Sequence, residues 1–255
     1  MFLSSKAVCS AAALCLLFSG CATRIEDGPR GSGLGGRVVT LPSAKQRLRF
    51  LALQEWKLWG RNRWDAATNT VERPAGAVVH REDVPDDAAR VLHYWYAYKE
   101  DGFRAQDALY ADGSLVPWSG AFISFLMKTA GIGPDSFPPS ELHWDYIKAI
   151  HDAPSRSGFE ALDAATEAPA VGDLICAPRG RTAERVTSFA QLSTPESRGA
   201  YHCDLVVEMA DRTLGAIGGN VLDGVTWTSV RLLDGRRLQP TPQRPWIVIL
   251  RNNVE

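Results

Sequence analysis

Three polar residues have the types and the order that nucleophilic catalysis requires. Ser119 stands where an apolar run begins, His202 opens a strand-like segment, and Asn220 lies near the end of the next such segment. A hydroxyl nucleophile needs a base within hydrogen-bond reach and a third group that orients the base. The separation of 83 residues between Ser119 and His202 is followed by one of 18 residues to Asn220, and the second suits a hairpin returning beside the histidine. These residues form a candidate catalytic set of nucleophile, base and orienting residue.

Each member of this set also has a purely structural explanation. A serine at a helix start can cap the helix, and an asparagine after two glycines suits a turn with positive φ. His202 could be an ordinary exposed or hydrogen-bonded histidine. Asp204 is on the same strand face as His202 and is an alternative orienting residue. His143 falls in the first turn of a short predicted helix, where it is either a weaker catalytic candidate or a surface or capping histidine.

The helix that must position Ser119 is predicted to be central. From Phe122 to Ala130 apolar residues occupy nearly every position, so this helix has no solvent face. Gly120 and Ala121 are small and would leave room for a ligand to approach the hydroxyl. The unpaired N–H groups and positive dipole at a helix start could also stabilise an oxyanion.

The remaining pattern predicts an α+β fold in a single domain over residues 42–255. Helices are expected at 42–59, 85–98, 119–130 and 140–150, and strands at 172–177, 202–209, 214–217, 225–233 and 246–251. Helices first and strands second favour N-terminal helices packed on a C-terminal antiparallel sheet or small open barrel of four to six strands. The segment 178–200 has no strand pattern, and loops of this length are usually functional or mobile.

Four motifs in order carry a resemblance to a known superfamily. They are Pro117-Trp118-Ser119-Gly120-Ala121-Phe122, Gly172-Asp173-Leu174-Ile175, His202, and Ile217-Gly218-Gly219-Asn220-Val221. In this order they resemble the papain-like bacterial cell-wall hydrolases of the NlpC and CHAP families. From about residue 45 the chain also looks like a bacterial lipoprotein family that is known only as a domain of unknown function and grouped with that superfamily.

The resemblance implies a papain-like fold whose groove hydrolyses or binds peptidoglycan peptides through Ser119, His202 and Asn220. It differs at the nucleophile, because those enzymes use cysteine where this chain has Ser119. A helix dipole and an imidazolium readily ionise a thiol, whereas a serine hydroxyl needs a base that is aligned in the transition state. The alternative is an inactive lipoprotein that binds peptidoglycan or a protein partner.

The N-terminus predicts export and lipidation. Lys6 precedes an apolar stretch, Ala7 to Phe18, which is too short to span a membrane. Ser19-Gly20-Cys21 then resembles a bacterial lipoprotein signal, which makes residues 1–20 a signal peptide and Cys21 the lipidated residue; an ordinary secretory signal is the alternative. Residues 21–41 are glycine-rich and are expected to be a flexible tether. Ala22 favours the periplasmic face of the outer membrane in a Gram-negative bacterium, with the lipid as the chain's only contact with the membrane.

Composition and cysteines limit the remaining functions. A formal net charge of −1 gives a nucleic-acid role no support. No metal-site spacing is present, and neither a metal nor a cofactor is expected. Outside the signal only Cys176 and Cys203 remain, in predicted neighbouring strands. In an oxidising periplasm they could form one disulfide, or they could be two buried free thiols.

Overall fold

A computed structural model describes residues 40–99 and 102–255. The predicted signal peptide, the lipidated Cys21 and nearly all of the predicted tether lie outside these residues. Leu41–Glu255 form one compact unit, and the fold below is that of this unit. None of the helices within the described residues combines the length and the apolar character of a membrane-spanning segment.

Of the α-helices within the described residues, α1 to α4 begin within three residues of the predicted positions, whereas α5 is not predicted. The α-helices are α1 (Ala44–Leu58), α2 (Pro85–Tyr98), α3 (Ser119–Thr129), α4 (His143–Asp152) and α5 (Arg181–Arg185). Short 3₁₀ helices are η1 (Ala105–Ala108), η2 (Pro154–Arg156), η3 (Phe189–Ser193) and η4 (Pro195–Ser197). A capping box of Ser43 and Gln46 starts α1, and α2 starts with Pro85 and two acidic residues at its positive end.

Nine strands within the described part of the chain form the sheet. They are β1 (Arg63–Asp65), β2 (Thr70–Glu72), β3 (Phe159–Asp163), β4 (Leu174–Pro178), β5 (Tyr201–Met209), β6 (Thr213–Val221), β7 (Gly224–Leu233), β8 (Arg237–Leu238) and β9 (Val248–Asn252). Their order is β2-β1-β7-β6-β5-β4-β9-β3, with β8 on β7. The α+β class is confirmed, but the predicted antiparallel sheet or small open barrel of four to six strands is corrected to a larger, mixed open sheet. In it β1 pairs with β7 in parallel, and short additional strands extend the sheet.

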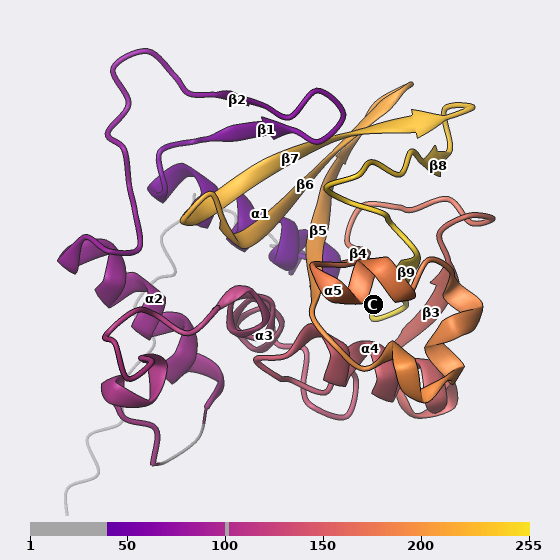
Figure 1. Ribbon diagram of the computed structural model, residues 1–255, viewed down its shortest axis with the longest axis horizontal. Coiled ribbons are helices and arrows are strands. Elements are labelled where there is room, and N and C mark those ends of the chain that lie inside the picture. The colour runs from indigo at the N-terminus through magenta and orange to yellow at the C-terminus, as the bar shows by residue number, and fades with distance from the viewer. Residues whose placement is uncertain (1–39, 100–101) are drawn as a thin grey trace, which may run out of the picture. The chain divides into compact units, whose positions relative to one another are not determined.

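The helices α1, α3 and α4 pack against one face of the sheet, and α2 packs on α3 (Figure 1). As the apolar run predicts, every residue of α3 from Ser119 to Met127 is buried. A second apolar cluster on other strand positions includes Ile175, Val206 and Ile249. The helix that carries Ser119 is therefore held between α2 and the strands β5 and β6.

The segment between β4 and β5 is ordered, although no strand pattern is present in its sequence. It contains α5, η3 and η4, and Arg185 ties it together by donating to the carbonyl oxygens of Glu196 (2.8 Å) and Arg198 (2.6 Å). At its base Cys176 pairs with Cys203 across β4 and β5, and the two form a disulfide. This excursion, residues 178–200, lies beside the start of α3 and supplies one wall of the site.

Candidate functional site

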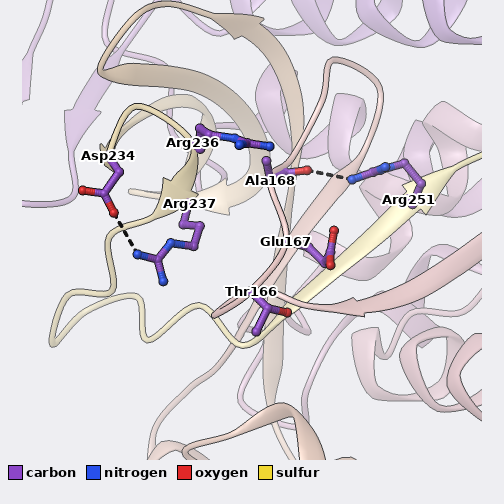
Figure 2. Close-up of a pocket in the computed structure, with 7 residues that line it drawn as sticks. All are labelled: Thr166, Glu167, Ala168, Asp234, Arg236, Arg237 and Arg251. Carbon is purple, nitrogen blue, oxygen red and sulfur yellow. Dashed lines mark hydrogen bonds and ion pairs between the residues drawn. The ribbon is translucent and has the colours of Figure 1, made fainter.

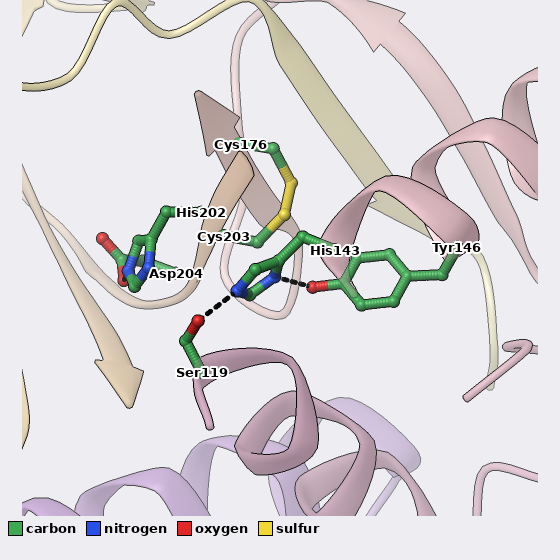
Figure 3. The surroundings of a disulfide bond; sticks show 7 residues. All are labelled: Ser119, His143, Tyr146, Cys176, His202, Cys203 and Asp204. Carbon is green, nitrogen blue, oxygen red and sulfur yellow. Dashed lines mark hydrogen bonds and ion pairs between the residues drawn. A yellow bond between two sulfur atoms is a disulfide. The ribbon is translucent and has the colours of Figure 1, made fainter. Parts of the chain in front are cut away.

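Ser119 is the first residue of α3, and its hydroxyl does not cap the helix. The residue in the N-cap position is Trp118, whose side chain makes no capping hydrogen bond. Ser119 Oγ instead lies 2.6 Å from Nε2 of His143, and the serine is only 4% exposed (Figure 3). The serine thus has a histidine partner, but this partner is the weaker of the two histidine candidates from the sequence.

Close packing of two segments brings His143 to the serine. A Cβ atom on Gly120 would overlap the carbonyl oxygen of Glu141, so only glycine allows this approach. One turn further along α3, the Ser124 hydroxyl donates to the Ser140 carbonyl (2.8 Å) and accepts from the Ser140 N–H (3.0 Å). The space that the sequence reserves for a ligand beside Gly120 is therefore filled by the backbone that leads into α4.

His143 is a buried and neutral histidine. Burial, followed by the positive potential of neighbouring His202, lowers the pKa of His143 well below its ordinary value. Its Nδ1 is hydrogen-bonded to the hydroxyl of Tyr146, one turn along α4. When Nδ1 carries the proton and donates to Tyr146, Nε2 is free to accept the Ser119 hydroxyl proton, as a general base must.

His202 lies beside this pair and has a carboxylate partner. Its Nε2 is 2.7 Å from Oδ1 of Asp204, two residues along β5 on the same face of the strand. The His202 and His143 ring centroids are 5.3 Å apart, and both His202 and Asp204 are buried. Burial lowers the pKa of His202; burial raises that of Asp204, but the adjacent His202 brings it below its ordinary value. Among the described residues, no partner bonds to His202 Nδ1 or Asp204 Oδ2.

Gly218 on β6 makes room for this hydrogen-bonded pair. A Cβ atom at this position would overlap Asp204 Oδ1 and lie 2.9 Å from His202 Nε2. The next residue, Gly219, lets the strand approach α3, because its Cβ would lie 2.6 Å from Cβ of Phe122. The two glycines before Asn220 thus serve close packing at the site.

Asn220 does not orient His202, which corrects the predicted third member of the set. The β6–β7 ladder shifts register between Gly218 and Val221, and Asn220 has φ 56°. Its side-chain amide donates to the carboxylate of Glu82, which also accepts from Trp118 Nε1 at 2.6 Å. Asp204, the alternative candidate, is the residue that bonds to His202.

A pocket of about 200 Å³ opens at Ser119 and His143. Its walls come from the segment before α3, the segment before α4 and the excursion. They include Val116, Pro117, Glu141, Leu142, Arg179 and Tyr201. Ser119 and His143 thus both line a small and largely apolar pocket.

A second pocket of about 500 Å³ lies elsewhere, lined by Arg236, Arg237, Arg251, Glu167 and Asp234 among others (Figure 2). Arg237 is 2.8 Å from Asp234, and Arg251 is 2.9 Å from Asp173. Only the first of these pairs lies within the pocket lining, because Asp173 is outside it, and none of the predicted site residues lines this pocket. Within the described part of the chain, no group of three or more His, Cys, Asp or Glu side chains could hold a metal ion.

A family model described as "Uncharacterized protein conserved in bacteria (DUF2272)" matches residues 82–252, about two thirds of the chain. The chain belongs to this family. The family span contains Ser119, His143, His202 and Asp204, whereas α1 and the strands β1 and β2 precede it. No curated protein and no solved structure is significantly similar to the chain.

Proposed function

We propose that the chain is a serine-dependent hydrolase of the cell envelope that cuts amide bonds in peptidoglycan peptides. The observation that carries this proposal is the 2.6 Å hydrogen bond between Ser119 Oγ and His143 Nε2, two residues that line the pocket. A hydroxyl that is bonded to a neutral imidazole and open to a pocket has the arrangement of an activated nucleophile.

In the proposed reaction Ser119 Oγ attacks the carbonyl carbon of the amide while its proton passes to His143 Nε2. The N–H groups in the first turn of α3 have no acceptor within the helix and can stabilise the oxyanion that forms. His143 then gives its proton to the leaving nitrogen as the C–N bond breaks, which leaves an ester on Ser119. Water, deprotonated by His143, attacks that ester, and the proton returns to Ser119.

Two nearby groups support His143 in this reaction. When Nδ1 carries the proton, its bond to the Tyr146 hydroxyl keeps the ring in the tautomer that can take the serine proton. The carboxylate of Asp204 bonds to His202 and offsets the positive charge that His202 would otherwise place beside His143. In this scheme His202 and Asp204 set the charge beside the His143 ring, whereas Ser119 and His143 exchange the proton.

The motif order and the architecture support a papain-like assignment and a cell-wall substrate. A helix with the nucleophile in its first turn packs on antiparallel strands, and one of them carries the histidine–carboxylate pair. The lipoprotein-type signal at Cys21 supports a location on the periplasmic face of the outer membrane, where peptidoglycan is within reach.

A peptidoglycan-binding protein without catalysis is the second candidate. The observation that favours it is the partner of His143, which is the neutral phenol of Tyr146 instead of a carboxylate. A buried imidazolium without a directly bonded anion is costly, and this limits how well His143 can take the serine proton.

Incubation of the full-length protein with purified sacculi, followed by analysis of the muropeptides, separates these functions. The hydrolase releases new fragments, and Ser119→Ala and His143→Ala abolish them. Ser155→Ala, which changes an exposed serine outside the site, is the matched control and retains activity. Retention on sacculi without fragments supports the binding protein. If the protein neither releases fragments nor is retained on sacculi, both functions are contradicted.

A further inference from the structure

The pocket above Ser119 contains an arginine that the proposed reaction does not use. Arg179 directly follows β4, and its backbone N–H donates to the carbonyl of Ala200 (2.9 Å) at the base of the excursion. Its backbone is therefore held in place, while its side chain is exposed and lines the pocket that contains Ser119 and His143.

The positive charge of Arg179 has no counterpart within the described part of the chain. No residue there accepts a hydrogen bond from its guanidinium or forms an ion pair with it. Glu141 is the one carboxylate among the described residues that line the pocket, and it accepts from Tyr98 and from Lys99 Nζ (3.0 Å). The pocket is thus left with a net positive charge that belongs to Arg179.

This charge lies close enough to act on the buried histidines. After burial and the neighbouring histidine, the positive charge of Arg179 is a further cause of the lowered pKa of His143. It also contributes to lowering the pKa of His202. A cation placed here without an anion opposes proton uptake by His143, and an anionic group on the substrate would relieve this effect.

The rest of the pocket limits the size and polarity of what it can take. The walls from Val116, Pro117 and Leu142 are apolar, and the volume is about 200 Å³. That is below the ~300–1,000 Å³ of pockets for drug-sized ligands, so the pocket suits one short segment of a larger substrate. A substrate segment that fits here would place a short apolar chain against these walls and an anionic group at its end, where it can bind the guanidinium of Arg179.

We propose that this pocket selects acyl groups that carry a free carboxylate within a few bonds of the scissile carbonyl, and that Arg179 binds the carboxylate. The inference rests on the proposed function for the position of the scissile carbonyl at Ser119. It adds a substrate class, a short acyl group with a terminal carboxylate, and it assigns the selectivity to one residue.

A pair of small esters tests the selectivity with the full-length protein. The mono-p-nitrophenyl ester of succinate presents a free carboxylate, and p-nitrophenyl butyrate presents a neutral acyl chain of the same length. We expect kcat/KM for the succinate ester to exceed that for the butyrate ester by about tenfold, the usual effect of one hydrogen bond to a charged group. Arg179→Gln brings this ratio close to one, and Arg179→Lys retains part of it.

Arg181→Gln is the matched control, because Arg181 is exposed, lies two residues away and does not line the pocket. This variant keeps the wild-type ratio. An equal ratio in the wild type and Arg179→Gln, with both esters cleaved through Ser119, overturns the inference and leaves the proposed hydrolase standing.

A binding measurement is independent of catalysis. In the full-length Ser119→Ala variant, ligand-observed NMR compares succinanilic acid with butyranilide, the anilides of the same two acyl groups. If the acid binds about tenfold more tightly than butyranilide and this difference is lost on adding Arg179→Gln, the inference is supported. This holds even if neither ester is cleaved, and in that case only the proposed hydrolase fails. Equal binding of the two anilides to Ser119→Ala contradicts it. A thermal unfolding curve for each variant verifies that Arg179→Gln is folded.

Discussion

At the scale of single residues, two neighbouring histidines have one fully buried carboxylate beside them, Asp204, and only one of the two histidines bonds to it. His202 bonds to Asp204, whereas His143 bonds to Ser119 and Tyr146. Asp204 fits beside His202 because the neighbouring position on β6 is Gly218 and has no side chain. The lack of a Cβ atom at Gly218 therefore leaves the space that Asp204 occupies.

Gly218→Ala tests this role. An alanine in a strand is ordinarily better than glycine, but here its Cβ would overlap Asp204 Oδ1. We expect the free energy of unfolding to fall by about 1–3 kcal/mol, as for other overpacked cores. Urea unfolding measures this change. Gly133→Ala is the control, because a Cβ there meets nothing within 4 Å; equal stability of the two variants contradicts the steric role of Gly218.

At the scale of elements, the geometry of the site depends on how the segment before α4 is attached to α3. Gly120 allows the Glu141 backbone to approach, and the fully buried Ser124 hydroxyl satisfies both the N–H and the C=O of Ser140. The distance between Ser119 and His143 is thus set by the junction of two segments, whereas Asp204 and His202 are set by a single strand.

Ser124→Ala tests this junction. The variant leaves the N–H and C=O of Ser140 without their partner, and we expect the free energy of unfolding to fall by about 1–3 kcal/mol. If the proposed hydrolase is active, fragment release should also fall, because His143 loses its fixed position. Urea unfolding and muropeptide release measure the two effects. Ser155→Ala should change neither the stability nor the fragment release. If Ser124→Ala loses stability but keeps the wild-type activity, the contact between Ser124 and Ser140 does not control the position of His143.

At the scale of the whole molecule, the folded chain buries two neutral histidines in its centre. The folded-state pKa values of His143 and His202 are both lowered, mainly by burial. Below the unfolded pKa of about 6.5, the unfolded chain binds protons at these positions that the folded chain does not. The folded state therefore loses stability as the pH falls through this value. Glu82 and Asp173, whose pKa values are raised by burial, act in the opposite sense.

We expect the free energy of unfolding to decrease between pH 6.5 and pH 5 by up to about 1.4 kcal/mol per pH unit for each of the two histidines. Urea unfolding at closely spaced pH values measures the slope. His143→Gln and His202→Gln should each reduce it, and comparison with the wild type removes the contributions of Glu82 and Asp173. An unchanged slope in both variants would mean that the histidines bind protons equally in the folded and unfolded chain.

The local elements followed largely from the sequence. The acidic start after Pro85 and the apolar run after Ser119 predict α2 and α3 to within a residue or two, because helix signals depend on neighbours along the chain. The same holds for β5 and β7, whose patterns are long enough to recognise. The strands β1, β2 and β3 have only three to five residues each and no clear pattern, so the sequence does not reveal them.

The sequence by itself determined that Ser119 begins a buried helix and that His202 and Asp204 share one face of a strand. Both properties follow from the period of a single element. Only the tertiary structure decided that His143 is the histidine bonded to Ser119 and that Asn220 bonds to Glu82. The first depends on the close contact of α3 with the segment before α4, and the second on a register shift in β6. Contacts between segments depend on how side chains fill the space between them, and the spacing of residues along the chain does not specify this.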